Sequence, residues 1–216
     1  MAYDHEEQEQ LASLKSWWHQ YGNLVTWALI VVLGAYAAWT GWNYYQRNQA
    51  AQAAQFYDEF QKALTAQDKE KIQRAAGDMQ SKFPRTAYAQ MTALNAAKFA
   101  FDANDLATAK AQLQWVIDKG ASDDYKAVAK VRLAGILLDE KAYDDGLKLL
   151  SGSFPEQFAS VVDDRKGDIF VAQNKLDDAR TAYQTALDKT EQKSPGRQLI
   201  QIKLDAIGGG TAKKAA

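Results

Sequence analysis

The side chains that most often perform catalysis or bind metals are scarce in this sequence. It contains no cysteine, and its two histidines are His5 and His19. General bases, activated nucleophiles and zinc sites are often built on these two residue types. Both histidines precede the longest apolar run, and His19 beside Trp18 is typical of a residue at a membrane interface. We find no catalytic constellation and predict that the protein is not an enzyme.

Pairs of adjacent aspartates are the remaining candidates for metal binding. The pairs are Asp123-Asp124, Asp144-Asp145, Asp163-Asp164 and Asp177-Asp178. Each falls at an expected turn or in the first turn of an expected helix, where a carboxylate interacts favourably with the helix dipole. The glycines at 208–210 follow an expected helix rather than a strand, so they do not form a phosphate-binding loop. We therefore expect no metal and no cofactor.

A long uncharged segment dominates the N-terminal part of the chain. Between Ser16 and Gln46 there is no Lys, Arg, Asp or Glu. As a helix, its apolar centre Leu24–Trp42 would be about 28 Å long, close to the hydrocarbon thickness of a bilayer. Aromatic residues typical of membrane interfaces flank it: Trp17, Trp18 and Tyr21 before it, and Trp39, Trp42, Tyr44 and Tyr45 after it. We predict a transmembrane helix over residues 24–45, surrounded by lipid.

Two other interpretations of the apolar run fit its flanks less well. A buried helix of a water-soluble protein is usually shorter or carries charges. A cleaved signal peptide would fit Ala35-Tyr36-Ala37, but its first part is normally short and positively charged. Residues 1–23 instead carry four acidic side chains against the single Lys15. We expect an acidic N-terminal segment over 1–23 and an uncleaved anchor. The basic residues near the run do not decide its orientation.

The rest of the chain is predicted to be helical. Its acidic and basic residues nearly balance, which argues against nucleic acid as a partner. Ala, Gln, Lys and Leu are abundant, proline is scarce, and apolar residues recur at intervals of three and four. No strand-like alternation stands out, so we predict an all-α domain over residues 46–207.

A repeat organises this domain. Three similar segments start at Asn104, Lys141 and Asn174. Each has a small residue near its start, and a second small residue lies twelve positions earlier. These small residues are Ala97 with Ala109, Ala134 with Gly146, and Gly167 with Ala179. We interpret them as points where two helices pack closely. A fainter copy upstream contains Ala63, Ile72, Ala75 and Met79.

The spacing resembles the tetratricopeptide repeat, whose period is 34 residues. The resemblance implies an α-solenoid of about four helix pairs. Ser194 and Pro195 predict the start of a C-terminal capping helix that ends before Gly208. We expect Leu199, Ile202 and Ala206 to dock on the last repeat, and residues 208–216 to form a flexible tail.

In such repeats, the first helix of each pair lines a concave surface. An apolar groove there suits extended or unfolded protein segments, although several of its residues would equally serve as core. Only Lys98 fits a clamp for a terminal carboxylate, so we expect no such clamp. The predicted concave residues are Met91, Leu94, Lys98, Phe101, Val128, Val131, Leu138, Val161, Asp164, Asp168 and Val171.

The whole layout resembles the bacterial YfgM family, with family-like segments at Trp39–Tyr45 and Phe83–Ala89. The resemblance implies an ancillary subunit of the SecYEG translocon in the inner membrane, with a cytoplasmic N-terminus and a periplasmic repeat domain. It also implies association with the chaperone PpiD and contact with newly translocated periplasmic chains. The sequence therefore predicts a non-enzymatic adaptor. The alternative is a scaffold or regulator of envelope assembly without chaperone activity.

Overall fold

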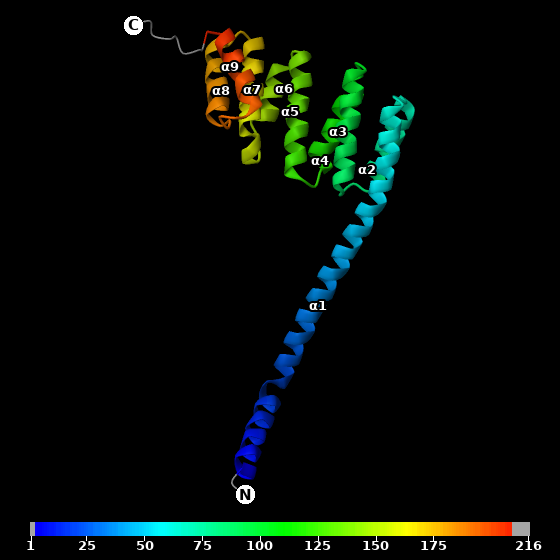
Figure 1. The fold of residues 1–216 in the computed structure, drawn as a ribbon, viewed down its shortest axis with the longest axis vertical. Helices are drawn as coiled ribbons and strands as arrows, with labels where there is room; N and C mark the ends of the chain where they lie inside the picture. The colour runs from blue at the N-terminus through cyan, green and yellow to red at the C-terminus, as the bar shows by residue number, and fades with distance from the viewer. Residues whose placement is uncertain (1–2, 209–216) are drawn as a thin grey trace, which may run out of the picture. The chain divides into compact units, whose positions relative to one another are not determined.

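The computed structural model describes the backbone of residues 3–208 and the side chains of residues 9–208. The chain divides into two compact units, Met1–Gln49 and Ala50–Ala216. The described residues form helices and no strand (Figure 1), which confirms the predicted all-α class. In the predicted tail at 208–216, all residues after Gly208 lie outside the described part of the chain.

Helix α1 (Tyr3–Thr65) runs through the first unit and into the second. From Glu9 onward it is long and apolar enough to cross a membrane, and it is the one such helix among the described residues. Most of its apolar side chains in the first unit are exposed, as they are at Leu24, Leu33 and Trp39. Apolar side chains with no protein neighbour are what a lipid-facing helix requires. The predicted span 24–45 therefore lies inside a longer helix.

The second unit contains the end of α1 and the helices that follow it in the described chain. These are α2 (Lys69–Lys82), α3 (Ala87–Asp102), α4 (Leu106–Lys119), α5 (Asp123–Asp139), α6 (Tyr143–Leu150), η1 (Glu156–Phe158), α7 (Ala159–Ala172), α8 (Leu176–Asp188) and α9 (Pro195–Ala206). From α2 onward, helices that follow in the chain pack on one another (Figure 1). The pairs α3/α4, α5/α6 and α7/α8 correspond to the three clear repeats, and the end of α1 with α2 corresponds to the faint one.

Small residues let the helices of a pair approach closely, as the repeat predicts. Ala97 and Ala134 are buried in the core. A Cβ on Gly146 would lie 3.7 Å from the carbonyl oxygen of Ala134 in α5 and 3.0 Å from Cδ1 of Ile169 in α7, the next pair. A Cβ on Gly167 would collide with the ring of Tyr183 in α8. These contacts confirm the interpretation of both glycines as close-packing points.

The turn inside each pair has the same geometry in all four pairs of the described chain. One residue per turn has a positive φ, at Gln67, Asn104, Lys141 and Asn174. The amide after it closes a Schellman-type bond, as Ala142 N donates to the carbonyl oxygen of Leu137 at 2.8 Å. Asparagine tolerates this left-handed conformation better than lysine or glutamine does. In two of the four turns, at Gln67 and Lys141, the residue with the positive φ therefore adopts it at a higher conformational cost than asparagine would.

The capping helix α9 forms as predicted but buries a different face. Ile200 and Leu204 are buried, whereas Leu199 and Ile202 are 56% and 57% exposed. The prediction that Leu199, Ile202 and Ala206 dock on the last repeat is therefore wrong. Both faces are apolar at helical spacing, so periodicity does not distinguish them. Interactions outside the apolar pattern accompany the observed rotation, including a bond from Arg197 to the carbonyl oxygen of Leu187.

Candidate protein-binding groove

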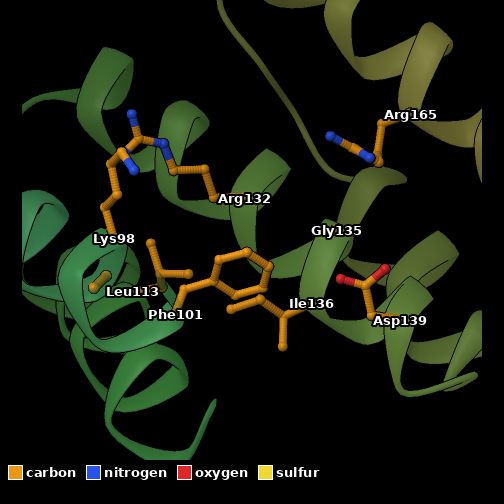
Figure 2. A pocket seen from close by; sticks show the side chains of 9 residues that line it. Lys98, Phe101, Leu113, Arg132, Gly135, Ile136, Asp139 and Arg165 are labelled. Atoms are coloured by element: carbon orange, nitrogen blue, oxygen red, sulfur yellow. The ribbon is translucent and has the colours of Figure 1, made fainter. Parts of the chain in front are cut away.

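A groove with a volume of about 470 Å³ opens between helices α3, α4, α5 and α7. Figure 2 shows the residues around it. Its lining residues are Ala97, Lys98, Phe101, Leu113, Arg132, Gly135, Ile136, Asp139 and Arg165. The volume falls within the range of small-ligand pockets, so the groove has room for a few side chains of a partner.

The floor of the groove is apolar. Leu113 and Ile136 are buried in the core, and the ring of Phe101 lies between them in Figure 2. Phe101 itself is 43% exposed. Ala97, the small residue of its repeat, leaves the α3 side of the groove without a larger side chain. A partner that covered Phe101 would remove apolar surface from water, which favours binding.

Four charged residues line the groove around this floor: Lys98, Arg132, Arg165 and Asp139. Lys98 Nζ lies 2.6 Å from Asp102 Oδ2, in an exposed pair on α3. Arg132 reaches from α5 to α3, where its Nη1 donates to the carbonyl oxygen of Leu94 at 3.3 Å. This bond places the guanidinium about one helical turn from Lys98. In the described part of the chain, Arg132 has no ion pair.

Arg165 closes the other side of the groove. Its Nη1 lies 3.2 Å from Asp168 Oδ2, and its Nε is buried without a hydrogen-bond partner among the described residues. The guanidinium carbon lies 3.6 Å from where a Cβ on Gly135 would be. Arg165 therefore lies along the α5 backbone, and the missing side chain at Gly135 leaves the groove open beside it.

The structure brings only some of the predicted concave residues to the groove. Lys98 and Phe101 line it. Leu94 and Val131 are buried in the core, and a partner does not reach them in this conformation. The other apolar candidates lie outside its lining. Met91, Val128, Leu138 and Val171 are partly buried, and Val161 is exposed.

Asp164 and Asp168 are engaged with the capping helix. Lys203 Nζ lies 2.8 Å from Asp164 Oδ1 and 2.8 Å from Asp168 Oδ1. Tyr183 Oη donates to Asp168 Oδ1 at 2.9 Å. Burial raises the pKa of Asp164 above its ordinary value, although Lys203 opposes this. Burial and the neighbouring Asp168 also raise the pKa of Tyr183. These aspartates therefore hold α9 on α7.

Sequence reasoning missed Arg132 and Arg165, and the expectation that Lys98 is the only suitable cation on this face is wrong. The signal was present in the repeat register. Asn95, Arg132 and Arg165 each stand two residues before the small residue of their helix, at Ala97, Ala134 and Gly167. A row of N–H donors therefore occupies the same position in α3, α5 and α7.

Taken together, these features define a class: a tetratricopeptide-repeat-like solenoid that follows a helix able to cross a membrane. The tetratricopeptide repeat-like domain family matches residues 15–209. Curated relatives named "Ancillary SecYEG translocon subunit" align with nearly the whole chain. The Neisseria gonorrhoeae relative is 32% identical over 211 residues, with 96% of this chain and 100% of the relative covered. The Escherichia coli relative is 26% identical, with 93% and 96% covered.

The chain belongs to the YfgM family, as these matches show. A third relative with the same name, from Haemophilus influenzae, is 26% identical, with 96% of this chain and 100% of the relative covered. No solved structure matches the chain. Tetratricopeptide-repeat-like ancillary subunits are a non-catalytic kind of protein.

Proposed function

We propose that the protein is a non-enzymatic adaptor at the SecYEG translocon, anchored in the bacterial inner membrane by α1. Its relatives are named as ancillary subunits of that translocon. The observation that carries the proposal is the groove: an exposed aromatic floor at Phe101, with cations at Lys98, Arg132 and Arg165, in a domain with a repeat-like fold. Such a surface suits an extended protein segment.

The partners that we propose are the translocon, the chaperone PpiD and newly translocated periplasmic chains. Anchoring makes weak binding sufficient, because two partners in one membrane have an effective concentration on the order of millimolar. A groove of this size therefore works as an adaptor site without high affinity. Rapid release also suits a surface that meets many different chains.

For the anchor we propose a span over 24–45, with residues 1–23 in the cytoplasm and the repeat domain in the periplasm. The flanking aromatic side chains from Trp17 to Tyr45 are exposed and available to the membrane interfaces. The cysteine-free chain allows a direct test with Ala121→Cys, in the exposed turn after α4. A membrane-impermeant maleimide should label it once the outer membrane is opened, and should label the control Ser13→Cys only after the inner membrane is lysed.

Co-purification with SecYEG in mild detergent tests the proposed association. We expect wild-type protein to retain SecYEG and Phe101→Glu to retain less of the groove-bound partners. Leu199→Glu is the matched control, because Leu199 is an exposed apolar residue on α9, outside the groove lining. Failure of the wild-type protein to co-purify with SecYEG under any mild condition would contradict the proposal.

A further inference from the structure

We propose that the groove selects extended segments that carry two acidic side chains about three residues apart, with an apolar residue between them. This inference rests on the proposed function and specifies the chemistry of the partner. The acidic side chains bind near Arg132 and Arg165, and the apolar side chain covers Phe101.

The donors are unsatisfied in a way that suits carboxylates. Arg132 has five N–H donors, and the structure gives it one bond, to the carbonyl oxygen of Leu94. Its planar fork matches a carboxylate with two parallel bonds. Lys98 stands about one turn away, and its exposed pair with Asp102 is weak enough to exchange for a partner's carboxylate. On the far side, Arg165 lines the groove with a side chain that is 33% exposed. Its Nη1 already bonds Asp168 and its Nε is buried, so a partner's carboxylate meets the exposed part of the guanidinium.

The floor between these donors is apolar and open. Gly135 lies between Arg132 and Arg165 and contributes no side chain (Figure 2). The exposed ring of Phe101 lies against Ile136, below this gap. A side chain that enters from the solvent therefore meets aromatic and aliphatic carbon, while the flanking residues of the same segment meet guanidinium groups.

The charge of the lining favours an acidic partner over a basic one, mainly at Arg132. Lys98 and Arg165 are paired with Asp102 and Asp168, whereas Arg132 has no ion pair among the described residues. A cationic segment would be repelled at Arg132, whereas an acidic one gains charge-assisted hydrogen bonds there. Asp139 lies on the turn of α5 that follows Ile136, so it does not neutralise Arg132.

The donors are spread along the solenoid, which favours acidic side chains over a terminal carboxylate. A single carboxylate needs donors that converge on one point. Here Arg132 and Arg165 come from two successive first helices, α5 and α7, and packed helices lie about 8–10 Å apart. An extended chain covers that distance in about three residues. This spacing gives the separation between the two acidic positions.

The test uses the full-length chain in nanodiscs and four fluorescent peptides. The first is acetylated and amidated and contains Glu-Leu-Phe-Glu. The second replaces both Glu residues with Gln, the third with Lys, and the fourth is the Gln peptide with a free terminal carboxylate. We expect the Glu peptide to bind at least about tenfold more tightly than the other three, as charge-assisted hydrogen bonds imply.

Two variants locate the binding. Arg132→Gln should reduce the affinity for the Glu peptide about tenfold and leave that for the Gln peptide unchanged. Arg85→Gln is the matched control, since Arg85 is exposed in the turn before α3 and outside the groove lining. It should change neither affinity. Thermal unfolding of both variants checks that they are folded, and Lys98→Gln provides a second groove variant.

Several results would overturn the inference. One is equal binding of the Glu, Gln and Lys peptides. Another is no binding of the Glu peptide at millimolar concentration. A third is binding of the Gln peptide with the free carboxylate as tight as that of the Glu peptide. If these occur while the wild-type protein still co-purifies with SecYEG, the selectivity is wrong and the proposed function stands. If co-purification fails as well, the proposed function is wrong.

Discussion

The ring of Tyr183 in α8 lies against Gly167 in α7, at the position where any other residue would carry its Cβ. The hydroxyl of the same tyrosine donates to Asp168, the next residue after Gly167. One side chain therefore fixes both the separation of the two helices and their register. Asp168 also binds Lys203, so this contact extends to the capping helix.

Substitution of Gly167 by alanine should lower the free energy of unfolding by roughly 1–3 kcal/mol, the usual effect of overpacking a core. The ring of Tyr183 has to move, and its bond to Asp168 lengthens or breaks. Urea unfolding followed by circular dichroism measures the change. Gly77→Ala is the control, because a Cβ there meets nothing within 4 Å. It should stabilise α2 by roughly 0.5–1 kcal/mol. Equal stability of the two variants would contradict the close contact.

Substitution of Lys141 by asparagine should raise the free energy of unfolding by about 0.5–1 kcal/mol. Lys141 has a φ of 62°, and asparagine occupies this region at lower conformational cost. The matched control is Lys148→Asn, at an exposed helical position of α6 where asparagine is the poorer helix former. A shift in the urea midpoint to higher concentration for Lys141→Asn alone is expected, and a shift to lower concentration would contradict the shared turn geometry.

The ionised carboxylate of Asp163 should stabilise the protein at neutral pH, and this contribution should be lost in acid. Burial opposes its ionisation, but hydrogen bonds from Lys189 and Lys166 hold its pKa below the ordinary value of 3.8. A carboxyl group with a lowered pKa contributes stability above that value, and the contribution is lost as the pH falls through the folded-state pKa. Asp163→Asn should therefore be less stable than wild type at pH 7, with a smaller difference at pH 3. A difference that is the same at both pH values would show that the lysines do not lower this pKa.

Leu33 lies near the centre of the predicted span, where an arginine would oppose insertion by about 2.5–3.5 kcal/mol. Leu33→Arg should therefore release much of the protein from membranes washed with carbonate. Leu14→Arg carries the same new charge outside the apolar run and should stay in the membrane pellet. Full retention of Leu33→Arg would show that this segment does not anchor the protein.

The helix pairs were predictable from the sequence because close helix packing requires small residues at a regular spacing. Ala97, Ala134 and Gly167 must be small wherever two helices touch, so they recur at the repeat spacing. The rotation of α9 was not predictable from its pattern. Leu199 and Ile202 lie on one apolar face and Ile200 and Leu204 on another, and long-range contacts of Lys203 and Arg197 accompany the observed choice.

Only some of the residues that line the groove could be predicted from the sequence. Apolar residues at concave positions of the repeat, such as Leu94 and Val131, are also the residues that fill the core. Lys98 and Phe101 follow from the repeat register, which places them on the first helix of their pair. Arg132 and Arg165 would have been found from the donor row that starts at Asn95. Their orientation, across to α3 and along Gly135, depends on tertiary contacts that no local pattern encodes.

The central claim is that the groove contacts protein partners at the translocon, and site-specific photo-crosslinking in intact cells tests it most directly. A photoreactive phenylalanine analogue replaces Phe101 in one strain and Leu199, which is also exposed but lies outside the groove lining, in another. We expect crosslinks from position 101 to SecYEG-associated proteins or newly translocated chains, which Arg132→Gln weakens, and none from position 199. Equal crosslinking from both positions, or none from position 101, would contradict the account.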